Sequence, residues 1–194
     1  MTSQLFQTLG LVAEILADLE KHWALIGGLA SSIYVEPRFT RDIDIAVSVE
    51  DDAEAEDFLR SWTARNFIID TVIEQDMTGR LATVRSHRSG APEGIIVDLL
   101  FASSGIEPEL ALEARFLEVI PALVVPVARP AHLFVLKLLS VDDKRPQDAI
   151  DLRELSELIV DEELEAARRV ARLIRARGYH RGRDLEALMD EYLG

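Results

Sequence analysis

The sequence predicts a mixed α/β (α+β) fold that ends in a C-terminal cap of helices, and three observations support this class. Helix-like and strand-like segments alternate through residues 1–129. From Pro130 to the end of the chain, the hydrophobic spacing is helical throughout. With 48% hydrophobic residues, the 194-residue chain can bury a core without disulfides or structural metals. We therefore expect a mixed-sheet core over residues 1–129 and a helical region, residues 130–194, packed on it.

The individual elements follow from periodicity, prolines, turn residues and capping aspartates. In the core we expect helices over 3–20, 29–35 and from 51 or 52 to about 62, and strands over 23–26, 42–47, 66–73, 80–88 and 94–101. An edge strand is expected over 123–127, because Pro121 and Pro126 restrict pairing. In the C-terminal region we expect helices over 130–141, 146–159, 162–177 and 184–192.

The most informative stretch joins a glycine pair to an aspartate strand. Gly27 and Gly28 follow an apolar strand, where glycine lets the backbone approach a phosphate closely. Asp42 and Asp44 alternate with isoleucines, so in a strand both carboxylates share one face. Two carboxylates about 5 Å apart repel by roughly 3 kcal/mol at an effective dielectric near 20, and a cation between them removes that repulsion. The stretch therefore predicts a metal-dependent phosphoryl- or nucleotidyl-transfer site, although solubility and turn formation alone would also explain such residues.

A third acid is expected beside the aspartate pair. Asp98 is a lone charge in the apolar segment GIIVDLLF, and a buried carboxylate needs a partner. A metal ion that is also bound by Asp42 and Asp44 is the favoured partner. The alternatives are an ion pair with an arginine such as Arg85, or exposure at a strand edge.

Composition excludes several classes of function. Cysteine is absent, which excludes disulfide scaffolds, zinc fingers and thiol nucleophiles and fits a cytoplasmic location. The net charge of −14 argues against non-specific DNA binding. No apolar run has membrane-spanning length, and residues 1–20 are not expected to be a signal peptide.

Charge is unevenly distributed along the chain. An acidic cluster follows the aspartate strand: Glu50, Asp51, Asp52, Glu54, Glu56 and Asp57. The C-terminal segment is rich in arginine: Arg168, Arg169, Arg172, Arg175, Arg177, Arg181 and Arg183. A solvated helix face is the more common reason for such a run, and a docking surface for RNA or an acidic partner is the alternative.

The order of these motifs resembles the nucleotidyltransferase superfamily typified by DNA polymerase beta. In that superfamily a hydrophobic residue and a glycine pair precede a helical spacer and an acid-hydrophobic-acid strand. Ile26, Gly27 and Gly28 match the first motif, and Asp42 and Asp44 match the second. The resemblance gives Asp98 the place of the third carboxylate.

A closer resemblance is to the AbiEii/AbiGii-type nucleotidyltransferase toxins, over roughly residues 20–160. These proteins often carry Arg-x-Thr-x-Asp-x-Asp, which Arg38 and Thr40 complete here together with the aspartate pair. They also carry a helical lysine, then a basic loop and an Asp-x-x-Asp-Leu motif. The matching residues are Lys137, Lys144, Arg145, Asp148, Asp151 and Leu152.

The resemblance implies transfer of a nucleoside monophosphate from a nucleoside triphosphate (NTP) to a hydroxyl acceptor, with Mg²⁺ or Mn²⁺. Its implied ligands are Asp42, Asp44 and Asp98, while Gly27, Gly28, Arg38, Thr40 and Lys137 would contact the nucleotide. Lys137 and Asp148 would be catalytic. Asp148 and Asp151 share one helix face and could orient Lys137 or Lys144, or simply stabilise the helix N-terminus.

Three interpretations of the function stay open at this point. The first is a toxin that acts on RNA, for example on tRNA 3′ ends, and has a cognate antitoxin. The second is an enzyme of the same fold with a small-molecule or protein acceptor. The third is a catalytically silent domain that binds a nucleotide or a partner protein.

Overall fold

The computed structural model describes residues 4–36, 40–90, 95–141 and 146–194. Within these ranges, helices and strands alternate up to β7, and only helices follow. The helices are α1 (Gln4–Asp18), α2 (Gly27–Tyr34), α3 (Asp52–Thr63), α4 (Glu107–Leu112), α5 (Pro130–Ser140), α6 (Pro146–Ser156), α7 (Asp161–Ala176) and α8 (Leu185–Leu193). The strands are β1 (Trp23–Ile26), β2 (Asp42–Val47), β3 (Phe67–Glu74), β4 (Leu81–Arg88), β5 (Ile96–Leu100), β6 (Arg115–Ile120) and β7 (Leu123–Val127).

The described strands form one mixed sheet in the order β3-β4-β5-β2-β1-β7-β6. β2 runs parallel to β5, and β1 runs parallel to β7. The pairs β1–β2, β3–β4, β4–β5 and β6–β7 are antiparallel. The aspartate strand β2 therefore lies in the middle of the sheet, between β1 and β5.

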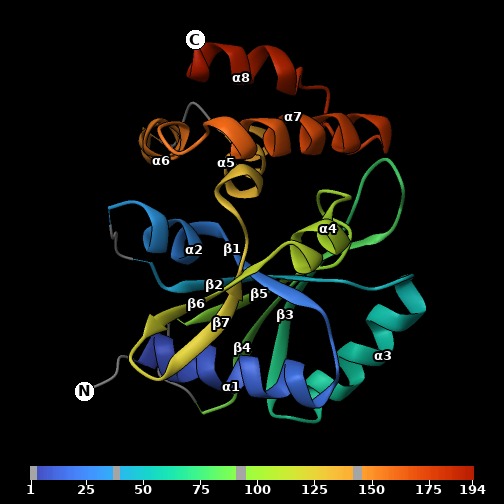
Figure 1. Cartoon of the computed structure of the whole chain (residues 1–194). Helices are drawn as coiled ribbons and strands as arrows, with labels where there is room; N and C mark the ends of the chain where they lie inside the picture. The colour runs from blue at the N-terminus through green and yellow to red at the C-terminus, as the bar shows by residue number, and fades with distance from the viewer. Residues whose placement is uncertain (1–3, 37–39, 91–94, 142–145) are drawn as a thin grey trace.

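Helices cover both sides of this sheet. In Figure 1, α1 and α3 lie below the sheet and α5 to α8 lie above it. α2 follows β1 directly and contacts β1, β2 and α5, so it lies between the aspartate strand and the C-terminal helices. The core extends through both layers, with Leu9, Ile43, Ile45 and Phe134 fully buried.

The sequence predicted most of these elements. The bounds of β1 and β2 agree with the expected strands, and α1, α3 and α5 to α8 lie within a few residues of the expected helices. Asp51 caps α3 as expected, because its side chain accepts a hydrogen bond from the Glu54 backbone N–H. Helix α4 and strand β6 were not expected.

One expectation about strand order was wrong. The segment Leu123–Val127 is not an edge strand, because β7 lies between β1 and β6. Pro126 does not prevent this placement, since the pairing of β7 with β1 begins beyond it, at Val127 opposite Leu25. The next residue, Ala128, donates its backbone N–H to the Leu25 carbonyl at 3.0 Å. The proline thus lies where only the β6 side of the ladder is formed.

Across the described residues, no helix is both long enough and apolar enough to cross a membrane.

Candidate active site

Two neighbouring strands, β2 and β5, bring the sequence-predicted carboxylates together. In the parallel β2–β5 pair, Asp44 lies opposite Asp98. Residues that are directly opposite in parallel strands point to the same face of the sheet, and Asp42 joins them by the two-residue period. Ile43 and Ile45 point to the other face and are fully buried. The predicted clustering of Asp42, Asp44 and Asp98 on one face is therefore what the fold produces.

These carboxylates line a cavity of about 680 Å³ between the sheet and the helices above it. The cavity contains Gly27, Gly28 and Thr40 from the predicted set, together with Lys137 from α5 and Asp148 from α6. Sequence segments that are far apart thus converge on one site. Its other lining residues include Ser31, Arg85, Leu100, Ser103, Ser104, Leu133, Leu136, Leu139, Ser140 and Arg181.

The pKa of one cavity carboxylate, that of Asp44, is strongly raised. Burial, and then the neighbouring charges of Asp98 and Asp42, raise the pKa of Asp44 to about 7. The positive charges of Lys137 and Arg85 oppose this rise without cancelling it. Ionising Asp44 is therefore costly while no cation is present, and a bound metal ion would remove that cost.

Gly27 allows the backbone to lie directly against Asp44. Its φ of +68° is in the left-handed region, and a Cβ atom at this position would lie 2.0 Å from the Asp44 Oδ2 atom. No other residue type fits there without displacing that carboxylate. The first turn of α2 begins at this glycine, lines the cavity through Gly27 and Gly28, and has no side-chain cap at its N-cap residue, Ile26.

Asp98 has a partner within the protein. Arg85, on the neighbouring strand β4, lies opposite Asp98 in the ladder and binds it with two hydrogen bonds. The Nε–Oδ1 distance is 2.9 Å and the Nη2–Oδ2 distance is 2.7 Å. This is the arginine ion pair that the sequence left as an alternative. Within the described ranges, no group of three or more His, Cys, Asp or Glu side chains could hold a metal ion on its own.

Lys137 is held between the two aspartates of α6. Its Nζ atom lies 3.0 Å from the Asp148 Oδ1 atom and 2.9 Å from the Asp151 Oδ2 atom. All three side chains are mostly buried, so the two carboxylates compensate the cost of burying the ammonium group. Of the roles that the sequence left open for the two aspartates, these contacts correspond to the orientation of Lys137.

Other predicted residues have a weaker structural basis. Thr40 lines the cavity, and its Oγ1 atom lies 3.4 Å from both the backbone nitrogen and the carbonyl oxygen of Asp42, which is long for a hydrogen bond. Arg38, Lys144 and Arg145 lie outside the described residues.

The sequence did not single out Arg181, Ser103 and Ser104 as residues of the cavity. Arg181 lies in the loop between α7 and α8, and it donates to the Ser103 carbonyl and hydroxyl oxygens at 3.2 and 3.3 Å. No local motif marks these residues, because the contact joins segments that are far apart in the chain.

Most of the C-terminal arginines have acidic partners. Arg169 binds Glu113 at 2.8 Å and Arg177 binds Glu109 at 2.7 Å, which attaches α7 to α4 and its C-terminal end. Longer ion pairs join Arg168 to Asp190 and Arg175 to Glu186. The basic character of this segment in the sequence is therefore largely compensated in the fold.

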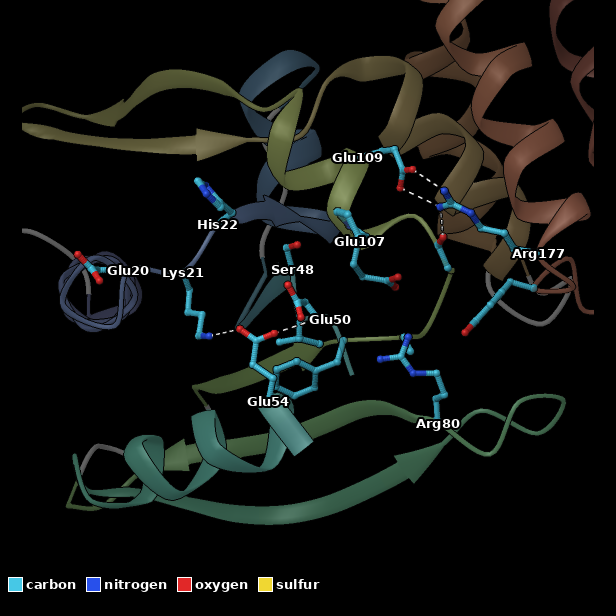
Figure 2. Close-up of a pocket in the computed structure, with 16 residues that line it drawn as sticks. Glu20, Lys21, His22, Ser48, Glu50, Glu54, Arg80, Glu107, Glu109 and Arg177 are labelled. Carbon is cyan, nitrogen blue, oxygen red and sulfur yellow. Dashed lines mark hydrogen bonds and ion pairs between the residues drawn. The ribbon is translucent and has the colours of Figure 1, made fainter. Parts of the chain in front are cut away.

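A second cavity, of about 620 Å³, contains none of the predicted site residues. Figure 2 shows its labelled side chains, which include the Lys21–Glu54 and Glu109–Arg177 ion pairs. It lies beyond the end of β2 that is opposite to Asp42, because Ser48, Val49 and Glu50 line it. Its glutamates are Glu20, Glu50, Glu54, Glu107 and Glu109.

The arrangement of the strands and helices is that of a nucleotidyltransferase. The antibiotic-resistance factor ANT(2'')-Ia is 16% identical over 91% of this chain and 95% of its own, with a TM-score of 0.54. An antigenic nucleotidyltransferase-like protein from Paracoccidioides brasiliensis is 19% identical over 96% and 92%, with a TM-score of 0.53. The lincosamide antibiotic adenylyltransferase LnuA, with lincomycin bound, is 12% identical over 81% and 98%, with a TM-score of 0.50. At these identities the likeness concerns the fold.

The chain belongs to the family of AbiEii toxins, which are nucleotidyl transferases of type IV toxin–antitoxin systems, because that family's model matches residues 11–193. The predicted fold class and family are thereby confirmed, and the protein is an enzyme of the nucleotidyltransferase type. No curated protein matches the sequence.

Proposed function

We propose that the protein transfers a nucleoside monophosphate from an NTP to a hydroxyl acceptor, with Mg²⁺ or Mn²⁺ as cofactor. The observation that carries this proposal is the convergence of Asp42, Asp44 and Asp98 on one face of the sheet, with Asp44 directly against the backbone of Gly27. This places an excess of carboxylate charge beside a helix N-terminus that can bind phosphate.

The carboxylate cluster fits a divalent cation. Oxygen ligands are what Mg²⁺ prefers, and it commonly binds one or two carboxylates while keeping waters and substrate phosphates as its other ligands. Asp42 and Asp44 are suited to this role because both line the cavity and ionising Asp44 is costly without a cation. Asp98 would be the third ligand once Arg85 gives up one of its two hydrogen bonds. When bound, the ion would neutralise charge on the triphosphate and on the leaving pyrophosphate.

The remaining residues of the cavity have distinct roles in this proposal. The backbone of Gly27 and Gly28 donates hydrogen bonds to phosphate oxygens, and Lys137 neutralises further phosphate charge. Asp148 holds Lys137 in position, and Asp98 helps to activate the acceptor hydroxyl. That oxygen attacks the α-phosphorus as the bond to the bridging oxygen breaks and pyrophosphate leaves. Thr40 and Arg38 are assigned to nucleotide contacts from the family motif alone.

The two parts of the chain would divide this work. Residues 1–129 form the catalytic core with the carboxylates and the glycine pair. Residues 130–194 form the helical region that supplies Lys137 and Asp148 to the same cavity.

The acceptor is proposed to be RNA, such as a tRNA 3′ end, with a cognate antitoxin as regulator, in keeping with the toxin family. A small-molecule or protein acceptor is the second candidate. One observation favours it: the ion pairs of α7 leave less free positive charge for an RNA backbone than the sequence suggested.

A labelled-transfer assay tests the proposal. The purified chain is incubated with each α-³²P-labelled NTP and with total tRNA, aminoglycosides or a protein extract. We expect label in one acceptor class, with equal release of pyrophosphate, only when Mg²⁺ or Mn²⁺ is present. Asp42→Asn and Asp44→Asn should each abolish transfer while the circular dichroism spectrum is unchanged. Equal transfer by these variants would contradict the proposed site.

A further inference from the structure

The positive charges that line the 680 Å³ cavity differ in how they are compensated. Among the described residues, three cationic side chains line it: Arg85, Lys137 and Arg181. Arg85 is bound to Asp98 through two hydrogen bonds, and Lys137 lies within 3.0 Å of both Asp148 and Asp151. Their charges are therefore already balanced by carboxylates.

Among the described residues, Arg181 has no such carboxylate partner. Its hydrogen bonds within the described part of the chain go to the uncharged carbonyl and hydroxyl oxygens of Ser103. These bonds fix the guanidinium group at the wall of the cavity without neutralising it. Partial desolvation, and then the positive charge of Arg183, lower the pKa of Arg181, although the side chain is still exposed to solvent, and the charges of Glu107 and Asp76 act in the opposite direction.

The other arginines of the C-terminal segment provide a comparison within the same chain. Arg168, Arg169, Arg175 and Arg177 lie outside the cavity, and each has an acidic partner. Among the described arginines of the C-terminal segment, Arg181 lines the cavity and is also one whose positive charge has no carboxylate partner. A planar guanidinium group held in this way presents several N–H donors in the geometry that phosphate oxygens accept.

The segment that carries Arg181 is firmly attached to the core. Arg177 donates to the Gly105 carbonyl at 2.5 Å, and the ring of Tyr179 packs so closely on Gly105 that a Cβ there would lie 2.4 Å from it. The loop after β5 and the loop after α7 therefore form one wall, in which Arg181 is held before a ligand arrives. Such preorganisation lowers the cost of binding.

From this charge balance we propose that Arg181 binds a phosphate group of the substrate in the cavity. The phosphate belongs either to the triphosphate tail of the nucleotide or to the acceptor. This assignment rests on the proposed function, and it adds a substrate-binding residue that the family motifs do not contain. It also gives the C-terminal region a direct contact with substrate beyond Lys137 and Asp148.

The test compares Arg181→Gln and Arg181→Lys with Arg88→Gln, an exposed arginine on β4 that lines neither cavity. Calorimetry measures the Kd of ATP, GTP, CTP, UTP and inorganic tripolyphosphate in the presence of Mg²⁺, and the transfer assay gives the KM for total tRNA. Thermal melting verifies that every variant is folded.

If the phosphate is that of the nucleotide, Arg181→Gln should weaken NTP and tripolyphosphate binding by about 10-fold to 100-fold, as expected for loss of a charge-assisted hydrogen bond. If it is that of the acceptor, the NTP Kd stays constant while the KM for tRNA rises by a similar factor. Arg181→Lys should lie between wild type and Arg181→Gln, because lysine keeps the charge but loses the planar fork. Arg88→Gln should resemble wild type.

Two results would overturn the proposal. If wild type binds Mg²⁺-NTP and Arg181→Gln matches it in both the NTP Kd and the tRNA KM, Arg181 contacts no substrate phosphate, while the proposed function stands. If wild type binds neither NTP nor tripolyphosphate, the proposed function and the role of Arg181 fail together.

Discussion

Asp44 shows at the scale of a single residue how a functional site opposes stability. Its carboxylate lies beside Asp42 and Asp98 and against the Gly27 backbone, and burial contributes most to its raised pKa of about 7. An ordinary aspartate has a pKa near 4, so the folded state holds a proton at pH values where the unfolded chain has lost it. Ionising Asp44 without a cation therefore costs folding free energy.

We predict that Asp44→Asn stabilises the metal-free protein at alkaline pH. Because the folded-state pKa is raised, wild-type stability falls as pH rises from about 4 to about 7, and the cost is complete above that range. The difference between the two pKa values sets an upper bound of about 4 kcal/mol. In EDTA, the melting temperature of Asp44→Asn should exceed that of wild type at pH 8, and the gap should close near pH 4.

Added Mg²⁺ should narrow the gap at pH 8, because only wild type gains a ligand for the ion. Equal melting curves for the two proteins at pH 8 in EDTA would show that Asp44 carries no such electrostatic cost.

Gly27 provides a second prediction at this scale, with Gly79 as its matched control. Both glycines have positive φ, at +68° and +66°, so alanine strains both backbones equally. At Gly79 no atom lies within 4 Å of the added Cβ, whereas at Gly27 it would meet the Asp44 carboxylate. Gly27→Ala should therefore lose Mg²⁺-NTP binding, measured by calorimetry, while Gly79→Ala keeps it at a cost of about 1 kcal/mol in stability. Normal binding by Gly27→Ala would mean that the close approach is not needed.

At the scale of elements, α5 and α6 form a unit in which one lysine is held by two aspartates. Asp148 and Asp151 both lie about 3 Å from Lys137, but of the two only Asp148 lines the cavity. Asp151 therefore orients Lys137 without lining the cavity, whereas Asp148 orients Lys137 and also faces the cavity.

Substituting each aspartate by asparagine should distinguish these roles. Asp151→Asn should lower kcat modestly, because Lys137 keeps one carboxylate, and the melting temperature should fall because a buried charge loses a partner. Asp148→Asn should lower kcat by at least another 10-fold if it also faces the reacting groups. Steady-state transfer kinetics measure both values. An equal loss in the two variants would restrict Asp148 to positioning Lys137.

Local patterns in the sequence predicted most helices and strands. They failed to predict features that depend on pairing between strands that are far apart in the chain. The alternation in β2 predicted both its bounds and the buried face of Ile43 and Ile45. Strand β6 was missed because it lies at the edge of the described sheet and none of its residues is fully buried, which leaves a weak hydrophobic pattern. The placement of β7 inside the sheet depends on its pairing with β1, and no local signal encodes that pairing.

The same distinction holds for the site. Asp42 and Asp44 were recognisable from their own strand, and Asp98 from its isolation in an apolar run. The bidentate contact with Arg85 was one of the alternatives, and only the β4–β5 register selects it. The sequence placed Arg181 only in an arginine-rich segment, and its position in the cavity could not be predicted, since its relation to Ser103 depends on how α7 and its following loop pack on the core.

At the scale of the whole molecule, the net charge is −14, but the positive and negative side chains are not spread evenly. Within the described part of the chain, ion pairs compensate four arginines of the C-terminal segment, and carboxylates compensate two of the three cations that line the site. Among the described residues of the cavity, the carboxylate of Asp44 on β2 is costly to ionise, and the guanidinium group of Arg181, in the loop after α7, has no carboxylate partner. This separation suits a substrate that brings a metal ion and phosphates together.

The most direct measurement is a calorimetric titration of each Mg²⁺-NTP into wild type and into the Asp42→Asn/Asp44→Asn double variant. The account predicts that wild type binds at least one nucleotide, only with the metal present, and that the double variant loses this binding while it remains folded. Metal-dependent binding of the same affinity in both proteins would contradict the central claim, because the two aspartates would then hold no ion.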